Sequence, residues 1–436
     1  MKTTRLLMYA LCAGVLLFNV ACSDDKGVNP NNPDTDDYTD SKLTPDEHKA
    51  KIESIGKDFV LKFKSQENEK IAKALYDLDE MIHDSNFDEL FDDDEEYSYA
   101  FSSLAKVILK NDISALTKVA SDVEKYELSK YTGIFTCKKD RTDGYVWTKM
   151  EADHKMQLNF RSETAGEDCI FTMIYSGERI YKKVDGYEIE VPAKVNANLK
   201  VGNEEVLNLA VDINLNNEQT AATANVNLTV SKDYVWSVKT NVSGESATVN
   251  YDMNIHGEKV MSASAEVTGT KMTDPDYIEN NENALNRVFT EGEFSYQILD
   301  LLIQGKGDIA AMISAYDKLD YDYNWGDEVA SKKCADREAQ IFNDYAKVAM
   351  YYVGKKEKVA DVKMTIDFDE EYYWSNGDRV EFKDYYSVPA LVFASDDSSI
   401  LLEDYFTETR FSSLIDATEK LINEFADILD LEHVEL

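Results

Sequence analysis

The sequence is poor in the residues from which metal and nucleophilic sites are usually built. It contains five histidines and five cysteines among 436 residues. No pair of histidines has the spacing of an HExxH helix, and neither a Gly-x-Ser-x-Gly elbow nor a Walker loop is present. These absences exclude the familiar motifs of zinc hydrolysis, serine hydrolysis and nucleotide binding. We therefore expect a protein that is not an enzyme and holds no cofactor.

Positive charge is also scarce. Lys and Arg number 46 against 84 Asp and Glu, so the formal net charge is −38. A field of this sign repels phosphate backbones and anionic lipid surfaces. The composition therefore excludes nucleic acid as an expected partner.

The cysteines are too few and too irregularly spaced for a zinc site. Cys12 lies in the apolar leader and Cys22 directly follows it, which leaves Cys137, Cys169 and Cys334 for the folded part. Cys137 and Cys169 both fall in expected strands. They could form a disulfide in an oxidising compartment, and the sequence leaves that pairing open.

The first 21 residues have the features of a secretion signal. Lys2 and Arg5 precede an apolar run over residues 6–18. The run is too short for a bilayer, which needs about 20 apolar residues. It ends at Ala21-Cys22, a small residue directly before a cysteine.

This ending resembles a lipobox, although Asn19 stands where Leu, Val or Ile is usual. The resemblance implies cleavage before Cys22, whose sulfur then carries a diacylglycerol. Ser23, Asp24 and Asp25 resemble the export signal of Bacteroidota-type surface lipoproteins. That likeness implies an outer-membrane protein that faces the cell exterior and has the membrane as its partner. The alternatives are an ordinary signal peptide cut near Ala21 and a solvated acidic spacer.

Three further segments follow the leader. Residues 22–43 are rich in Pro, Asn and Asp, and we expect a disordered tether. Residues 44–130 are predicted to be helical, because Thr44-Pro45-Asp46-Glu47 forms a capping box before apolar residues at helical spacing. The helical pattern first uses Ile52, Ile55, Phe59, Val60 and Phe63.

Residues 131–270 alternate between apolar and polar side chains. The clearest run is Leu207, Leu209, Val211, Ile213 and Leu215, with polar residues or alanine between them. Turn residues such as Gly202-Asn203 and His256-Gly257 separate the runs. The pattern predicts an antiparallel meander of at least six long strands with one apolar face.

The apolar face of this sheet needs a cover. Each buried aliphatic side chain contributes about 1.5–3 kcal/mol, so an uncovered face would lose much stability. The cover could be the flanking helices, a lipid-like ligand or the membrane. The pattern resembles the half-barrels of lipoprotein carriers, which hold acyl chains on such a face. Small side chains that suit a concave surface or close helix packing are Ala193, Ala197, Ala222, Ala224, Ala263 and Ala265.

Residues 271–436 have a mixed pattern. Helices are predicted through residues 294–302, 309–319, 328–353 and 411–431, and a hairpin turn at Ser375-Asn376-Gly377-Asp378. No Pro/Gly linker separates the blocks after residue 43. The fold class is therefore α+β: a long-stranded antiparallel β-meander, either open or half-barrel in shape, whose apolar face is packed by N- and C-terminal helices in one domain.

Two acidic stretches carry the candidate sites. Asp320, Asp322 and Asn324 alternate as calcium ligands do, but Gly326 falls one place later than an EF-hand requires. An acidic turn between helices is the alternative.

The second stretch contains Asp367, Asp369, Glu370 and Glu371, beside Tyr372, Tyr373 and Trp374. Paired carboxylates can cleave glycosidic bonds, and exposed aromatic rings can stack on sugars. The alternative is the wet face of a strand with core aromatics.

Two functions follow. The preferred prediction is a lipid-anchored envelope protein that acts as a non-catalytic binding or structural module and holds a hydrophobic ligand on the sheet. The alternative is a surface protein that binds or hydrolyses glycans with exposed carboxylates and aromatics.

Overall fold

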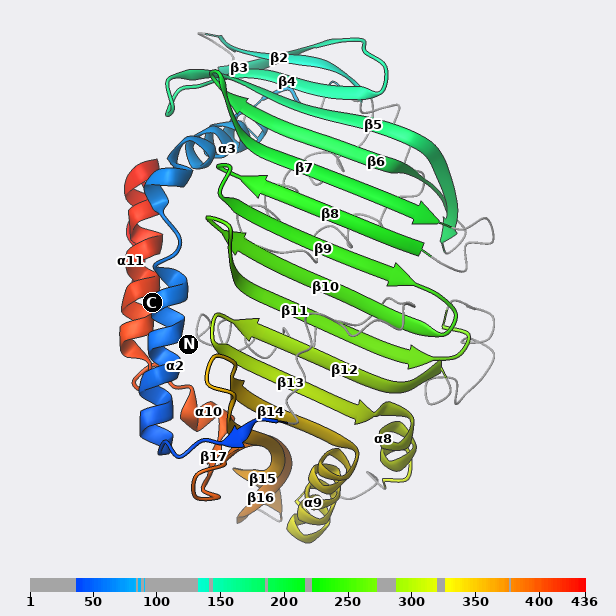
Figure 1. Ribbon diagram of the computed structural model, residues 1–436, viewed down its shortest axis with the longest axis vertical. Helices are drawn as coiled ribbons and strands as arrows, with labels where there is room; N and C mark the ends of the chain where they lie inside the picture. Colours follow the sequence, from blue (N-terminus) through cyan, green and yellow to red (C-terminus); the bar gives the residue numbers. More distant parts are fainter. Residues whose placement is uncertain are drawn as a thin grey trace.

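A computed structural model describes residues 37–83, 85–87, 90, 132–140, 144–184, 187–215, 222–272, 288–319, 326–375 and 378–436. Most of this chain forms one long, open antiparallel meander, with helices along one end of its strands (Figure 1). The predicted α+β class and antiparallel meander are confirmed. Among the described residues, none of the helices has the length and apolar character that a membrane span requires.

The strands follow one another across the sheet nearly in chain order. An eight-stranded part has the order β3-β2-β4-β5-β6-β7-β8-β9, and a second part runs from β10 to β17 with β1 beside β15. β9 and β10 lie side by side where the two parts meet (Figure 1). The strands are β1 (Thr39–Asp40), β2 (Gly133–Asp140), β3 (Gly144–Met150), β4 (Lys155–Ser162), β5 (Glu167–Val184), β6 (Tyr187–Val201), β7 (Glu204–Leu215), β8 (Ala222–Val230), β9 (Tyr234–Val242), β10 (Ser246–Ile255), β11 (Glu258–Gly269), β12 (Phe289–Ile298), β13 (Leu301–Asp308), β14 (Ala346–Tyr352), β15 (Glu357–Ser375), β16 (Asp378–Phe393) and β17 (Ser399–Leu401).

Two helices precede β2, two lie between β13 and β14, and two follow β17. They are α2 (Pro45–Val60), α3 (Glu69–His83), α8 (Ile309–Tyr316), α9 (Glu328–Tyr345), α10 (Leu402–Tyr405) and α11 (Ser412–Leu429), with a 3-10 turn at Ser65–Asn68. The predicted capping box begins α2. Thr44 Oγ1 accepts from the Glu47 amide, and the Glu47 carboxylate accepts from the Thr44 amide at 2.8 Å.

The prediction for residues 294–302 was wrong. Phe294, Ile298, Leu301 and Leu302 have helical spacing, yet they lie in β12 and β13. Short apolar runs fit either structure, and strand pairing decides here. The Phe294 ring lies over Gly305 on the neighbouring strand, where any added Cβ would come within 2.4 Å of it.

The helix predicted over residues 328–353 is only partly confirmed. It ends at Tyr345, and residues 346–352 continue as β14, where Val348, Met350 and Tyr352 alternate along one face. The helix over 309–319, the paired strands on both sides of Asn376-Gly377 and the C-terminal helix agree with the sequence pattern.

Two apolar clusters hold the helices against one end of the strands. The first joins α3 to β2–β11, and its members include Leu75 and Leu78 of α3 with Leu158 and Leu199 of the sheet. The second joins α2 to β13–β16 and to the segment around Tyr405. The helices α2 and α3 therefore cover the ends of the strands next to the turns at Gly202 and Gly257, and α11 packs against α2 and α3 (Figure 1).

A buried aspartate fixes α3 to the turn between β4 and β5. Asp77 accepts hydrogen bonds from the Ser162 hydroxyl at 2.5 Å, the Thr164 amide at 2.9 Å and the Thr164 hydroxyl at 2.6 Å. Such charge-assisted bonds are stronger than neutral ones and compensate the carboxylate for its lost water. Asp77 therefore holds α3 in place against this turn, and its role is structural.

His48 is expected to make the fold sensitive to acid. It is buried in the second cluster, with Nδ1 3.0 Å from the Tyr352 hydroxyl and its ring stacked on Phe393. Burial lowers the pKa of His48 below 6.5, and the nearby Lys51 ammonium lowers it further. Because the unfolded chain then takes up a proton at a higher pH than the folded chain, the free energy of unfolding should decrease as pH falls below 6.5.

Urea unfolding about one pH unit above and below that value tests this prediction. The midpoint of the wild-type chain should fall more on acidification than that of His48→Gln. Equal changes in the two proteins would assign the acid sensitivity to other groups.

Candidate functional site

The apolar face of β6–β9 is sealed at one end and partly open farther along. Next to the helices, Leu199, Leu207, Val230 and Tyr234 form a row across the four strands and are 0–8 % exposed. Four residues farther from the helices along each strand, a second row crosses the same strands and every member is partly exposed. This valine row consists of Val195, Val211, Val226 and Val238.

The valine row is more exposed than the sealed row because the helices do not extend over it. Leu209 and Leu228, which lie between the two rows, still pack against the cluster that contains α3. The valine row belongs neither to that cluster nor, apart from Val238, to the side chains packed against it. The sheet thus presents an apolar strip that the described helices leave partly accessible.

Aromatic side chains continue the apolar face on β10–β12. Tyr251 and Tyr296 lie on this face, and the Tyr296 hydroxyl points toward Met261 Sδ at 3.3 Å. Burial raises the pKa of Tyr296 to about 12 and also raises the pKa of Tyr251. Both phenols are neutral near neutral pH, as tyrosine ordinarily is, so neither adds a charge to this face.

The cysteines do not form a disulfide in this structure. Cys137, Cys169 and Cys334 each carry a thiol that is not part of a disulfide. Strand β4 lies between the strands of Cys137 and Cys169, since it pairs with β2 on one side and β5 on the other. A disulfide requires Cα atoms within about 7 Å, whereas strands two places apart are separated by more than that. The pairing that the sequence left open is therefore absent here.

The acidic and aromatic stretch around residue 370 lies on a projecting hairpin. β15 and β16 pair from Ala360–Phe393 out to Ser375–Asp378, but β14 accompanies β15 only as far as Val362. Beyond that point the two strands form a ribbon. The hairpin tip at residues 376–377 lies outside the described residues.

Helix α9 supports this ribbon at its edges. The Glu328 carboxylate accepts from the Lys383 amide at 2.8 Å, and the Glu338 carboxylate accepts from the Ser387 hydroxyl at 3.1 Å. The Asn343 side chain bonds both the amide and the carbonyl of Met364, at 2.9 and 2.8 Å. An isolated two-stranded ribbon is marginal in water, so these contacts fix its position.

The two faces of the ribbon differ. On one face the rings of Tyr373 and Phe382 lie 5.9 Å apart, Phe382 is buried, and Gly326 packs against Tyr373. On the other face Trp374, Tyr372 and Phe368 are 68 %, 46 % and 36 % exposed. We call this second surface the aromatic face.

Charged side chains of both signs lie between the exposed rings of the aromatic face. The cross-strand pairs on this face are Phe368–Tyr385, Glu370–Lys383, Tyr372–Glu381 and Trp374–Arg379. The Arg379 guanidinium lies 4.3 Å from the centre of the Tyr372 ring, and Lys383 Nζ lies 3.7 Å from that of Phe368. Arg379 also bonds Glu381 at 3.1 Å.

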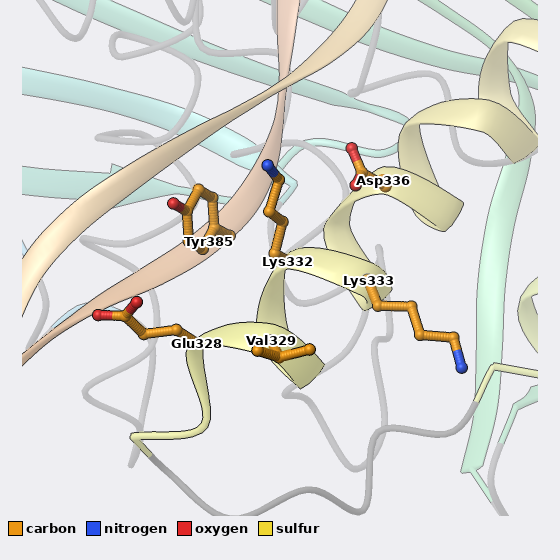
Figure 2. Close-up of a pocket in the computed structure, with 6 residues that line it drawn as sticks. All are labelled: Glu328, Val329, Lys332, Lys333, Asp336 and Tyr385. Carbon is orange, nitrogen blue, oxygen red and sulfur yellow. The ribbon is translucent and has the colours of Figure 1, made fainter.

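A shallow pocket of about 330 Å³ lies where α9 meets β16. In Figure 2, Lys332 lies between Tyr385 and Asp336, while Lys333 points away. Lys332 Nζ is 5.6 Å from the centre of the Tyr385 ring. The pocket is open to solvent and lined by charges of both signs.

The carboxylates proposed for glycoside cleavage do not face one another across a cleft. Asp367, Asp369 and Glu371 share one face of the ribbon, while Glu370 lies on the opposite one. Asp369 accepts from the Tyr386 hydroxyl at 3.3 Å. Glycosidases need two carboxyl groups that flank a bound sugar, and these acids lie along an exposed strand.

The remaining predicted site residues lie outside the described residues. These are the lipidation residue Cys22, the export signal Ser23, Asp24 and Asp25, and the calcium candidates Asp320, Asp322 and Asn324. Within the described ranges, no group of three or more His, Cys, Asp or Glu side chains is arranged to hold a metal ion.

Comparison with known proteins gives no relative. No protein-family model, curated protein sequence or solved structure matches this chain. The functional argument therefore depends on the residues themselves.

The sequence pattern did not identify Arg379, Lys383 and Tyr385 as parts of the site. A signal for them was present. Counting outward from the Asn376-Gly377 turn places Arg379 opposite Trp374 and Lys383 opposite Glu370, the register found in the structure. The contribution of Lys332 and Asp336 on α9 depends on tertiary packing and had no comparable local signal.

Proposed function

We propose that this chain is an exported lipoprotein, anchored through Cys22 in the outer membrane, whose sheet binds a hydrophobic ligand without catalysing a reaction. The leader and Ala21-Cys22 support the anchor. Ser23, Asp24 and Asp25 support a position on the outer face of that membrane. The acidic body remains soluble at the end of its tether.

The valine row carries the ligand proposal. It lies on the same four strands as a row that is almost completely buried, yet its members stay partly exposed. A contiguous apolar strip on the surface of a protein is a common binding feature. Its width matches a ligand of acyl-chain character, because four strands at about 4.8 Å separation span roughly 14 Å between the outer two.

The chemistry of the strip favours a chain-like apolar ligand. The neighbouring side chains farther from the helices include Ile213 and Ala224, directly opposed across β7 and β8. Charged residues of these strands, such as Asp212 and Lys194, lie on the opposite face and pair with each other at 2.8 Å. A ligand on the valine row would thus contact methyl groups without burying a charge.

Lipid extraction tests the proposal. The full chain with Cys22→Ser, which removes its own acyl chains, should bring lipid with it through purification from the native host. Val226→Asp places a charge at the centre of the valine row and should reduce the lipid recovered by about tenfold or more, since burying an unpaired carboxylate costs several kcal/mol. Mass spectrometry of the organic extract measures this yield.

Asn227→Asp is the matched control, because Asn227 is the next residue on β8 and is exposed on the opposite face. Its lipid yield should equal that of the Cys22→Ser parent. Circular dichroism should confirm that both variants remain folded. Lipid-free parent protein, or equal yields from Val226→Asp and Asn227→Asp, would refute a ligand on the valine row.

A further inference from the structure

We propose that the aromatic face of the β15–β16 hairpin is a second binding site, separate from the valine row, and that it takes a neutral glycan chain. The site comprises the exposed rings of Phe368, Tyr372 and Trp374 with the charged side chains between them. It lies at the opposite end of the sheet from β6 (Figure 1), and it does not depend on the proposed lipid function.

The exposed rings have no core role to explain them. The buried aromatic residue of the hairpin lies on the other face, where Phe382 packs against Tyr373, while on the aromatic face Phe368 contacts Tyr385 at 5.5 Å and Trp374 has no such ring partner among the described residues. Trp374 is more than two-thirds exposed although tryptophan is among the residues most favourably buried. Exposed aromatic side chains of this size commonly mark a binding surface.

The order of side chains along the strand selects the class of ligand. Same-face neighbours in a strand are about 6.7 Å apart, so Trp374, Tyr372 and Glu370 give two rings and a carboxylate within about 13 Å. Protein interfaces deplete charged residues at their cores, whereas here charges lie between the rings. A sugar chain presents apolar C–H faces and hydroxyl groups alternately over the same distances. Its C–H faces can stack on the rings, and its hydroxyl groups can form hydrogen bonds with the charged side chains between them.

The charges select a neutral chain. The face contributes Glu370 and Glu381 against Arg379 and Lys383, so it is balanced locally although the whole protein has a net charge of −38. The Arg379 guanidinium contacts the Glu381 carboxylate and the Tyr372 ring. These two contacts leave fewer of its N–H groups available for an anionic ligand. Arg379 is paired with Glu381, and Glu370 lies opposite Lys383 in the strand register, so an anionic polysaccharide would meet a carboxylate near each positive charge and would be repelled by the rest of the protein.

The open geometry favours binding along a chain. The face is a projecting ribbon, and the pocket beside it, lined by Lys332 and Tyr385, is open to solvent. A long polymer can pass across such a surface, and Lys332, Asp336 and the Tyr385 hydroxyl offer hydrogen-bonding groups at its edge (Figure 2).

Affinity electrophoresis of the full chain with Cys22→Ser tests the inference. The native gels contain amylopectin, barley β-glucan, galactomannan or xylan as neutral probes, and polygalacturonate as the anionic probe. We expect retardation by at least one neutral polysaccharide and none by polygalacturonate. Adding Trp374→Ala or Tyr372→Ala should weaken the retained interaction by about tenfold, the loss expected for one stacking ring.

Tyr345→Ala is the control, since Tyr345 is an exposed aromatic residue at the end of α9 outside the aromatic face. This variant should be retarded as strongly as its parent. Because Trp374 is so exposed, its removal should leave the circular dichroism spectrum and the lipid yield unchanged. The inference is overturned if no neutral polysaccharide retards the parent, if only polygalacturonate does, or if the Trp374→Ala, Tyr372→Ala double variant is retarded equally.

Discussion

Replacing Trp147 with alanine is expected to lower the free energy of unfolding by about 4 kcal/mol. The side chain is 1 % exposed and meets the Phe87 ring at 5.0 Å. Its indole Nε1 donates to the Met81 carbonyl near the end of α3 at 2.9 Å. The substitution removes the contact that joins α3 to the outermost strand of the sheet, and leaves both a cavity and an unpaired carbonyl.

The backbone of Trp147 also closes the edge of the sheet. The Asn86 side chain accepts from the Trp147 amide at 2.8 Å and donates to its carbonyl at 3.3 Å. An open edge strand is prone to pair with another chain. Loss of the Trp147 side chain should loosen this contact, so the alanine variant should also aggregate more readily on warming.

Urea unfolding followed by circular dichroism measures the effect. Trp147→Phe keeps most of the apolar volume and loses the hydrogen bond. Its free energy of unfolding should therefore lie between that of the wild type and that of Trp147→Ala. Met150→Ala is the control, because Met150 lies on the same strand and is 60 % exposed. A loss below about 1 kcal/mol for Trp147→Ala would show that α3 does not depend on this residue.

Cys22→Ser is expected to move the protein from the membrane fraction to the soluble fraction in its native host. Each buried CH₂ of an acyl chain contributes about 0.8 kcal/mol, so stable anchoring needs more than one chain, as a diacylated cysteine provides. The rest of the chain offers little to replace it, because its strong negative charge disfavours anionic lipid surfaces. Cell fractionation and immunoblotting measure the distribution.

Cys12→Ser serves as the matched control. Cys12 lies inside the apolar run of the leader, and cleavage before Cys22 would remove it. This variant should remain with the membrane. Release of both variants would point to a general export defect rather than to loss of the anchor.

The meander was predictable because its signal is local and repeated. Alternating runs such as Leu207–Leu215 specify both the strand and the buried face, and turn residues such as Gly202 and Gly257 mark where each strand ends. Gly257 follows His256, and both have positive φ, as a tight two-residue connection requires. The capping box at Thr44 was equally local and equally informative.

The failures came where the apolar pattern was short. Residues 294–302 and 346–352 contain too few apolar positions to distinguish the two-residue period of a strand from the 3.6-residue period of a helix. Both segments form strands because they pair with β11 and β15. The sequence also could not show how much of the sheet the helices cover. That depends on where α3 ends relative to residues such as Val226 far along the chain.

The candidate site was predicted only in part. The sequence placed Tyr372 and Trp374 beside a hairpin turn, but not their exposure or the burial of Phe382 on the other face. Those properties follow from the docking of α9, whose contacts with β16 join residues more than fifty positions apart. Charge balance on the aromatic face likewise becomes visible only once Arg379 is placed opposite Trp374.

Metabolic labelling with an alkyne analogue of palmitate tests the central claim, that an acylated Cys22 holds this sheet-and-helix body at a membrane, most directly. The wild-type protein should take up the label, with mass spectrometry placing it on an N-terminal peptide that begins at Cys22, and the Cys22→Ser variant should remain unlabelled. A wild-type protein without label, or a Cys22→Ser variant retained at the membrane as firmly as the wild type, would contradict the account.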